Sequence, residues 1–111
     1  MILNILMFKN RKINAFTTPN FTDLEPEKAA KGLERSLIAN ADDVKLLKSY
    51  ENLDLFFVGT FDDEIGVITP VRPEFLLSPA EIILQIRTEK VNAQLKVDEP
   101  KEAVKDEVSN N

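Results

Sequence analysis

The chain has 111 residues, which is enough for one domain with its own hydrophobic core and too few for two such domains. It carries 14 basic and 19 acidic residues, a net charge of -5, so any binding to a phosphate backbone must use a local basic patch. Cysteine and histidine are both absent, which excludes disulfides, thiolate nucleophiles, imidazole bases and almost every zinc site.

The chain opens with a short apolar run from Ile2 to Phe8, which predicts a buried strand. The run is too short to span a bilayer, and its basic residues follow it, whereas those of a secretory signal come first. We therefore expect no membrane segment here. Residues 9–12 (KNRK) form a basic turn into a second run, residues 13–16. If that run is also extended, the segment 17–20 with its proline ends it.

A helical period begins after Thr22. Pro26 suits a first helical turn, and apolar residues then recur at three- and four-residue spacing until about Asn40. Gly32 weakens this helix by about 1 kcal/mol relative to alanine, so either packing compensates or another group approaches closely. Asp42 or Asp43 can then cap a short second helix.

The strongest local pattern is the stretch from Leu53 to Thr69, which predicts two strands joined by a tight acidic turn at Gly66. Both faces of its first strand carry bulky apolar groups, so we expect this strand to be central in the sheet. Two-residue alternation puts Leu53, Leu55, Phe57 and Phe61 on one face and Asp54, Phe56, Val58 and Thr60 on the other.

The sequence PVRPEFLL after Thr69 has two prolines three residues apart, which predicts an extended connection and not a strand inside a sheet. Ser78, Pro79 and Glu81 then make a capping box at the start of a third helix. From residue 96 to the end there are three lysines, five acidic residues and few apolar ones, a composition that cannot offset the entropy of ordering. We therefore expect one domain at residues 1–91 and a charged, disordered tail at residues 92–111.

The predicted order is strand, possible strand, helix, short helix, strand, strand, helix. This mixture, with a hairpin in its middle, indicates an α+β fold: a small, mainly antiparallel sheet with a central β-hairpin and with helices packed on one face.

The segment LFFVGTFDDEIGVITP, residues 55–70, resembles the most characteristic stretch of the small nonstructural proteins of gokushovirus-type microviruses, which are phages with circular single-stranded DNA. That family carries a Gly-x-Phe/Tyr-Asp-Asp/Asn-x-x-Gly hairpin, matched here by Gly59, Phe61, Asp62, Asp63 and Gly66. Upstream, residues 16–19 are similar to the family's aromatic-x-x-Pro segment, and the helix with Arg35 is similar to its basic helix.

The resemblance covers about residues 1–87 and leaves the tail unmatched. The chain departs from the family at residues 41–43, where Ala-Asp-Asp replaces a pair such as His-Pro before the acidic residue. It departs again in its opening strand, which lacks the frequent tyrosine and aspartate. The resemblance implies a nonstructural accessory protein of viral DNA replication that binds DNA in the host cytoplasm, and it supplies no binding residues.

Single-strand binding needs a basic groove and aromatic faces on which bases stack. A cationic cluster of Lys9, Arg11 and Lys12, flanked by Phe8 and Phe16, is the candidate site, with single-stranded DNA as the candidate ligand. The competing interpretation is a solvated turn beside phenylalanines of the core. Phe56 is the candidate for an exposed aromatic residue if the helices cover only the opposite face.

The sequence gives weaker support to a cation-binding site and to a catalytic site. Asp62, Asp63 and Glu64 carry oxygen ligands suited to a hard cation, but their spacing is unlike an EF-hand loop, and an exposed turn explains them better. No spacing of carboxylates, lysines or serines nominates a catalytic group, so we expect a non-enzyme without a cofactor or metal. The alternative function is a regulatory protein that forms a homodimer or binds a viral or host protein through an exposed strand edge.

Overall fold

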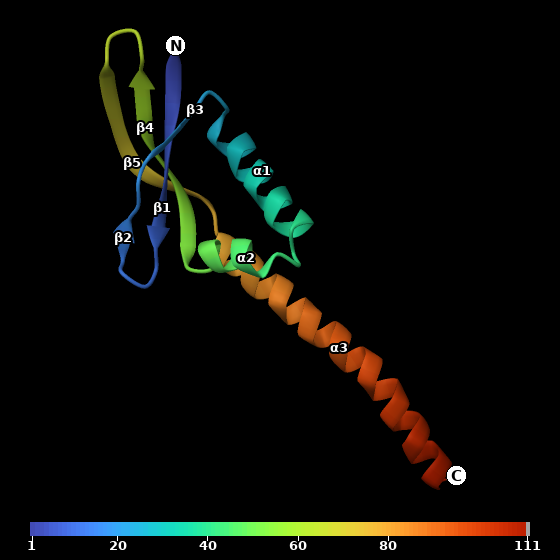
Figure 1. Cartoon of the computed structure of the whole chain (residues 1–111). Helices are drawn as coiled ribbons and strands as arrows, with labels where there is room; N and C mark the ends of the chain where they lie inside the picture. Colours follow the sequence, from blue (N-terminus) through green and yellow to red (C-terminus); the bar gives the residue numbers. More distant parts are fainter. Residues whose placement is uncertain (111) are drawn as a thin grey trace.

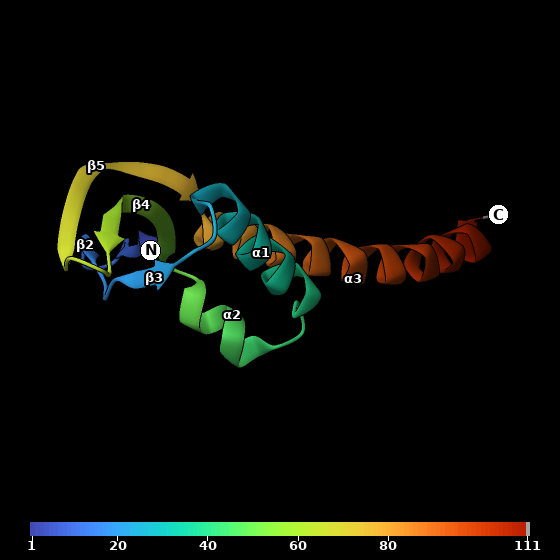
Figure 2. The same ribbon diagram turned by 90° about the horizontal axis from the view of Figure 1, so that it is seen from above.

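The structure, a computed structural model, describes residues 1–110, and for residues 96–110 it describes only the helical backbone. Within that range the chain forms three helices and one five-stranded antiparallel sheet that contains the predicted hairpin. The three helices lie to one side of the curled sheet (Figures 1 and 2). The predicted α+β fold is therefore confirmed.

The sheet is built around two long neighbouring strands, β1 and β4. Its order is β2-β1-β4-β5, and β3 pairs with β1 beside β2. The strands are β1 (Ile2–Asn10), β2 (Ala15–Phe16), β3 (Asn20–Thr22), β4 (Leu53–Asp62) and β5 (Val67–Leu77). The second run is thus extended only at its end, because Asn14 takes a left-handed φ of 51° in the turn before it. β3 was not predicted as a strand.

The acidic turn joins β4 to β5 as the sequence predicts. Gly66 has a φ of 68°, and its amide donates to the carbonyl oxygen of Asp62 at 2.8 Å. The side chain of Asp62 accepts from the Glu64 amide at 3.0 Å, and Asp63 lies 2.9 Å from the amino group of Met1. In the described part of the chain, no group of three acidic side chains is arranged to hold a metal ion. These contacts make the acidic residues part of the turn itself.

The prediction of a non-strand connection after Thr69 is wrong. β5 runs through Pro70 and Pro73 to Leu77 and pairs with β4 along most of its length. The prolines are tolerated because β5 is the edge strand, where amides on the outer side need no partner within the sheet. The hairpin is therefore longer than its sequence pattern indicates.

The predicted position of Phe61 is also wrong. Leu6 of β1 lies opposite Phe57, whereas Ile5 lies opposite Gly59, so Val58 is an extra residue in β4. This β-bulge resets the alternation of side chains along the strand. Beyond it, Phe61 lies on the face away from the helices, where its ring contacts that of Phe21.

The helices start where the sequence predicts. α1 spans Pro26–Ala39, α2 spans Val44–Tyr50 and α3 spans Pro79–Asn110. Asp43 caps α2 by accepting from the Leu46 amide at 3.1 Å, and Ser78 caps α3 by accepting from the Glu81 amide at the same distance. These side chains satisfy backbone donors that the first helical turn leaves unpaired.

Two buried clusters hold the layers together. One joins the helices to one another and consists of Leu37, Leu47, Ile83 and Ile86. The other joins α1 to the sheet and consists of Leu6, Ala30 and Leu55, with Phe8 and Phe57 packed against it. The residues of β1 and β4 that belong to this second cluster define the helix-covered face of the sheet.

α3 continues as a helix beyond residue 91, where the sequence predicts that the domain ends. Its later part projects away from α1 and α2 (Figure 1). The side chains of residues 96–110 and all of residue 111 lie outside the described part of the structure, so the prediction of disorder there does too.

Candidate nucleic-acid interface

Three phenylalanines from three strands form a row across the face of the sheet that the helices leave open; we call them the aromatic row. They are Phe16 of β2, Phe56 of β4 and Phe75 of β5. Phe56 lies opposite Met7 and Phe75 in the sheet register, one position away from the helix-covered residues. Alternation along the strands therefore turns Phe56 and Phe75 away from α1.

The rings of the aromatic row touch one another edge to face. The centroids of Phe16 and Phe56 are 5.5 Å apart, and those of Phe56 and Phe75 are 5.8 Å apart. The outer members remain accessible, with Phe16 40% and Phe75 59% exposed. Phe56, between them, is half-buried. Adjoining rings that remain partly accessible are suited to contact with flat apolar groups such as nucleic-acid bases.

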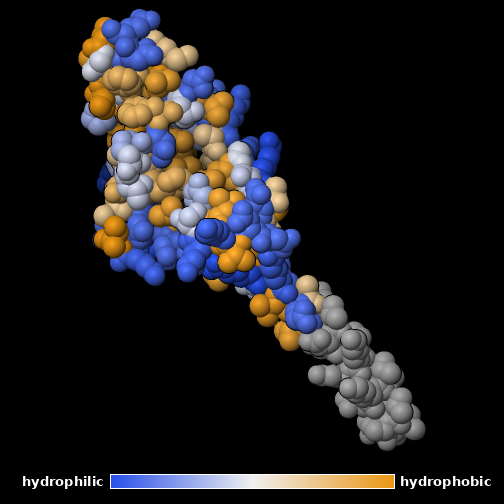
Figure 3. Space-filling view, in the orientation of Figure 1, coloured by the Kyte–Doolittle hydropathy of each residue, from blue (hydrophilic) through white to orange (hydrophobic). Residues whose placement is uncertain are grey.

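A second aromatic pair extends this face toward the other end of the sheet. Phe21 of β3 and Phe61 of β4 have ring centroids 5.5 Å apart, and Phe21 is 48% exposed. Met7 and Ile5 of β1 share this face by alternation: Met7 lies opposite Phe56 of the row, and Ile5, which is buried, lies opposite Phe21 of the pair. Hydrophobic residues gather over the strand-rich end of the molecule in Figure 3. The residues placed on the open face are therefore mainly apolar, with Lys9 at the end beside Phe16.

Of the predicted cations, Lys9 is the one that joins the aromatic row. It lies opposite Phe16 in the register, and its Nζ is 5.6 Å from the centroid of the Phe16 ring. A cation at this distance over a ring is attracted by the negative face of the π system. The structure therefore brings together Lys9 and Phe16, two of the four predicted site residues.

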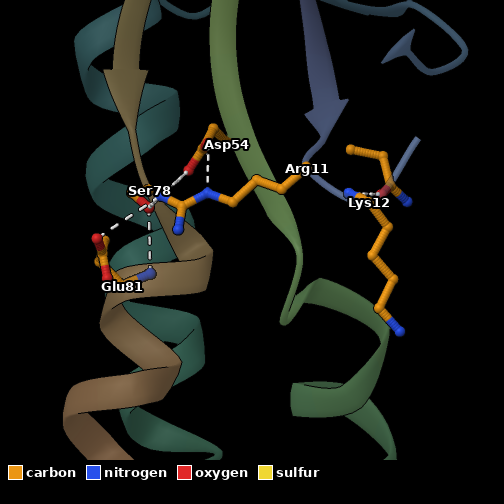
Figure 4. Close-up of polar contacts among 6 residues, drawn as sticks. Arg11, Lys12, Asp54, Ser78 and Glu81 are labelled. Carbon is orange, nitrogen blue, oxygen red and sulfur yellow. Dashed lines mark hydrogen bonds and ion pairs between the residues drawn. The ribbon is translucent and has the colours of Figure 1, made fainter. Parts of the chain in front are cut away.

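Arg11 is engaged elsewhere. Its guanidinium donates two hydrogen bonds to the carboxylate of Asp54, at 2.8 and 3.0 Å, and a third to the hydroxyl of Ser78 at 3.1 Å (Figure 4). Glu81 lies 3.7 Å away on the other side. The hydrogen bond to Asp54 is also the main reason why the pKa of Arg11 is raised. Nε and one terminal nitrogen of Arg11 are therefore engaged within the protein, and the charge of Arg11 is already paired with a carboxylate, which makes it a poorer phosphate ligand than a free arginine.

Asp54 is the centre of this cluster. Burial, the largest single influence, raises its pKa, but the hydrogen bonds from Arg11 and Ser78 together with the charge of Arg11 outweigh burial and lower it. The cluster joins the turn after β1, the start of β4 and the first turn of α3. We interpret it as a structural clasp.

Lys12 points away from the clasp and is exposed on the turn (Figure 4). Its backbone amide donates to the side chain of Asn10 at 2.9 Å. It is therefore near the end of the sheet but outside the aromatic row. Phe8, which the sequence places beside the cationic cluster, lies on the helix-covered face with its ring against Tyr50.

Sequence reasoning missed Phe21, Phe61 and Phe75 as members of the open face. Phe75 was missed because the two prolines of its segment predict a connection and not a strand. Phe61 was missed because the bulge at Val58 moves it to the face opposite the predicted one. A search for phenylalanines in every predicted extended segment, without regard to predicted face, would have found Phe61 and Phe75 but not Phe21, because β3 was not predicted as a strand.

No family model, curated protein or solved structure matches the chain. The resemblance to gokushovirus nonstructural proteins therefore stays a prediction. Among the described residues, no helix is both long enough and apolar enough to cross a bilayer.

Proposed function

We propose that this protein is a non-enzymatic accessory protein of phage genome replication that binds single-stranded DNA across the open face of its sheet. The observation that carries the proposal is the aromatic row, three adjoining phenylalanines with Lys9 at one end. The phage setting and the host cytoplasm rest on the resemblance of residues 55–70.

The chemistry of the open face favours single strands over duplex. Unpaired bases can stack on phenylalanine rings, and each such contact is worth about 1 to 3 kcal/mol. In a duplex the bases are already stacked and the outer surface is phosphate, which calls for many cations. The protein has a net charge of -5, and Arg11 is held by Asp54. Stacking is therefore the main source of affinity in this proposal.

The test is fluorescence anisotropy of a labelled oligothymidylate of about 15 nucleotides, near the upper end of known single-strand site sizes. We expect Phe75→Ala to weaken binding by about 1 to 3 kcal/mol, because it removes a stacking surface. Leu84→Ala, a change at an equally exposed apolar residue of α3, is the matched control and should bind like the wild type. Equal losses in both variants would contradict the proposal.

Salt dependence gives a second readout. The logarithm of the association constant falls with the logarithm of salt concentration by about 0.7 for each phosphate neutralised on a single strand. Lys9 and Lys12 are the cations of the predicted cluster that are not bound to a carboxylate within residues 1–95, so we expect a shallow slope of about -0.7 to -1.4. Lys9→Ala should reduce the magnitude of this slope by about 0.7. A steep slope would indicate that another basic surface binds the strand.

A second candidate function, a protein that dimerises or binds a protein partner, is favoured by the edge strand. β5 presents exposed Val67, Ile68 and Val71, and no other strand in the described part of the chain pairs with its outer side. Sedimentation equilibrium distinguishes this function from the first. If the protein dimerises through β5, it should self-associate, Ile68→Lys should abolish the self-association, and salt should hardly change it. DNA binding by a monomer predicts no self-association.

A further inference from the structure

A groove of 460 Å³ lies between α1 and α3, in the helix layer and not on the open face of the sheet. Its floor is formed by Ile38 near the end of α1, by Ala41 in the turn that follows, and by Ile82 and Ile86 from α3. Ile86 belongs to the buried cluster between the helices, whereas Ile38 is 56% exposed. The apolar lining of the groove thus extends from the buried core at Ile86 to Ile38 at the surface.

The charges of the groove are unbalanced. Lys90 is the basic residue of its lining, and its ammonium already donates to the carbonyl oxygen of Ala41 and lies 3.0 Å from Asp42. Glu34 and Glu89, which also line the groove, have no ion-pair partner within residues 1–95. Glu89 accepts an amide hydrogen bond from Gln85 at 3.3 Å. Two carboxylates that have no ion-pair partner among residues 1–95 therefore border an apolar floor.

We propose that this groove binds a short amphipathic helix of a partner protein, with apolar residues at three- and four-residue spacing and with lysine or arginine beside them. The apolar side chains would bury Ile38 and Ile82, and the cations would pair with Glu34 and Glu89. The occupant is helical because two helices offer no strand edge for an extended peptide, whereas a helix satisfies its own backbone and needs only an apolar face and matched charges.

The test is selection of a displayed library of random 16-residue peptides on the full chain and on two variants. Ile38→Glu puts a charge on the groove floor, and Leu84→Glu makes the same change at a residue of α3 that is 60% exposed and does not line the groove. Both positions are exposed, and circular dichroism checks that both variants fold. We expect enriched peptides to be cationic and amphipathic, and to bind Ile38→Glu at least about tenfold more weakly than Leu84→Glu.

The charge argument has its own readout. Replacing both Glu34 and Glu89 with lysine should reverse the selection, so that acidic amphipathic peptides are enriched on that variant. The proposal is overturned if no peptide distinguishes Ile38→Glu from Leu84→Glu, or if the selected peptides have no net positive charge. Enrichment of peptides that match this chain's own helices would also overturn it, because a second copy would then be the occupant.

Discussion

Gly59 and Gly32 differ sharply in what surrounds them. A Cβ atom added to Gly59 would lie 2.6 Å from the carbonyl oxygen of Thr69 and 3.1 Å from the Cα of Pro70. Both are backbone atoms of β5, so the hairpin would have to open to make room. A Cβ added to Gly32 on α1 would meet no atom within 4 Å.

The two glycines therefore predict opposite effects of the same substitution. Gly59→Ala should lower the free energy of unfolding by about 1 to 3 kcal/mol, the usual cost of overpacking. Gly32→Ala should raise it by about 0.8 to 1 kcal/mol, because alanine has the better helix propensity. Urea denaturation of both variants measures the two changes. If Gly59→Ala did not lower the free energy of unfolding, the close approach of β4 and β5 at Gly59 would be wrong.

Arg11 is a residue whose charge, but not whose partners, can be predicted from the sequence. Its charge and its neighbours Lys9 and Lys12 predict a site for phosphate, but its partners Asp54 and Ser78 are 43 and 67 residues away in the chain. A side chain's charge is visible in the sequence, whereas the group that neutralises it is fixed only by the fold. Lys9 kept its predicted surroundings because Phe16 is brought to it by a local hairpin.

The clasp makes a prediction at the scale of elements, because it joins β4 to α3 and to the turn after β1. The pKa of Asp54 is lower in the folded state than its ordinary value, so its ionised form stabilises the fold. That stability is fully present above the unfolded pKa of about 3.9, and it is lost as the pH falls through the lowered folded pKa. Acid should therefore loosen this junction.

Asp54→Asn tests the clasp. At neutral pH it should lower the free energy of unfolding by about 1 to 3 kcal/mol, since hydrogen bonds to a charged group are lost. The difference from the wild type should narrow below about pH 4, where wild-type Asp54 also becomes neutral. Urea unfolding at several pH values measures this difference in the free energy of unfolding. The control is Asp23→Asn, a change at an exposed residue of the loop before α1. A difference that stays constant with pH would show that the charge of Asp54 does not matter.

Elements whose ends depend on neighbouring residues were predictable. The caps at Asp43 and Ser78 act over three residues, so the starts of α2 and α3 can be derived from local sequence. The bulge at Val58 could not be predicted, because it exists only in the pairing of β4 with a distant strand. The strand character of residues 70–77 depends in the same way on β5 being at an edge, which the topology decides.

At the scale of the whole molecule, the aromatic row is a product of topology. Its members are widely separated in sequence, and the order β2-β1-β4-β5 brings them onto one face. The sequence predicted an α+β fold with helices on one side, and this arrangement necessarily leaves the other side of the sheet open. It did not predict that phenylalanines from three strands would meet there.

The aromatic row and the groove between α1 and α3 lie on different layers and share no residue. Substitutions at separate sites without common partners usually have additive free energies, so we expect the two surfaces to act independently. Ile38→Glu should leave the affinity for the oligothymidylate unchanged, and Phe75→Ala should leave binding of the selected peptides unchanged. The double variant should lose both.

Anisotropy titrations of the oligonucleotide with and without saturating peptide measure this independence directly. Equal affinities mean that one molecule can hold a DNA strand and a partner helix together, which is what an accessory protein needs in order to bring a partner to single-stranded DNA. Competition between the two ligands would mean instead that both use the open face of the sheet, and the groove would then lose its proposed role.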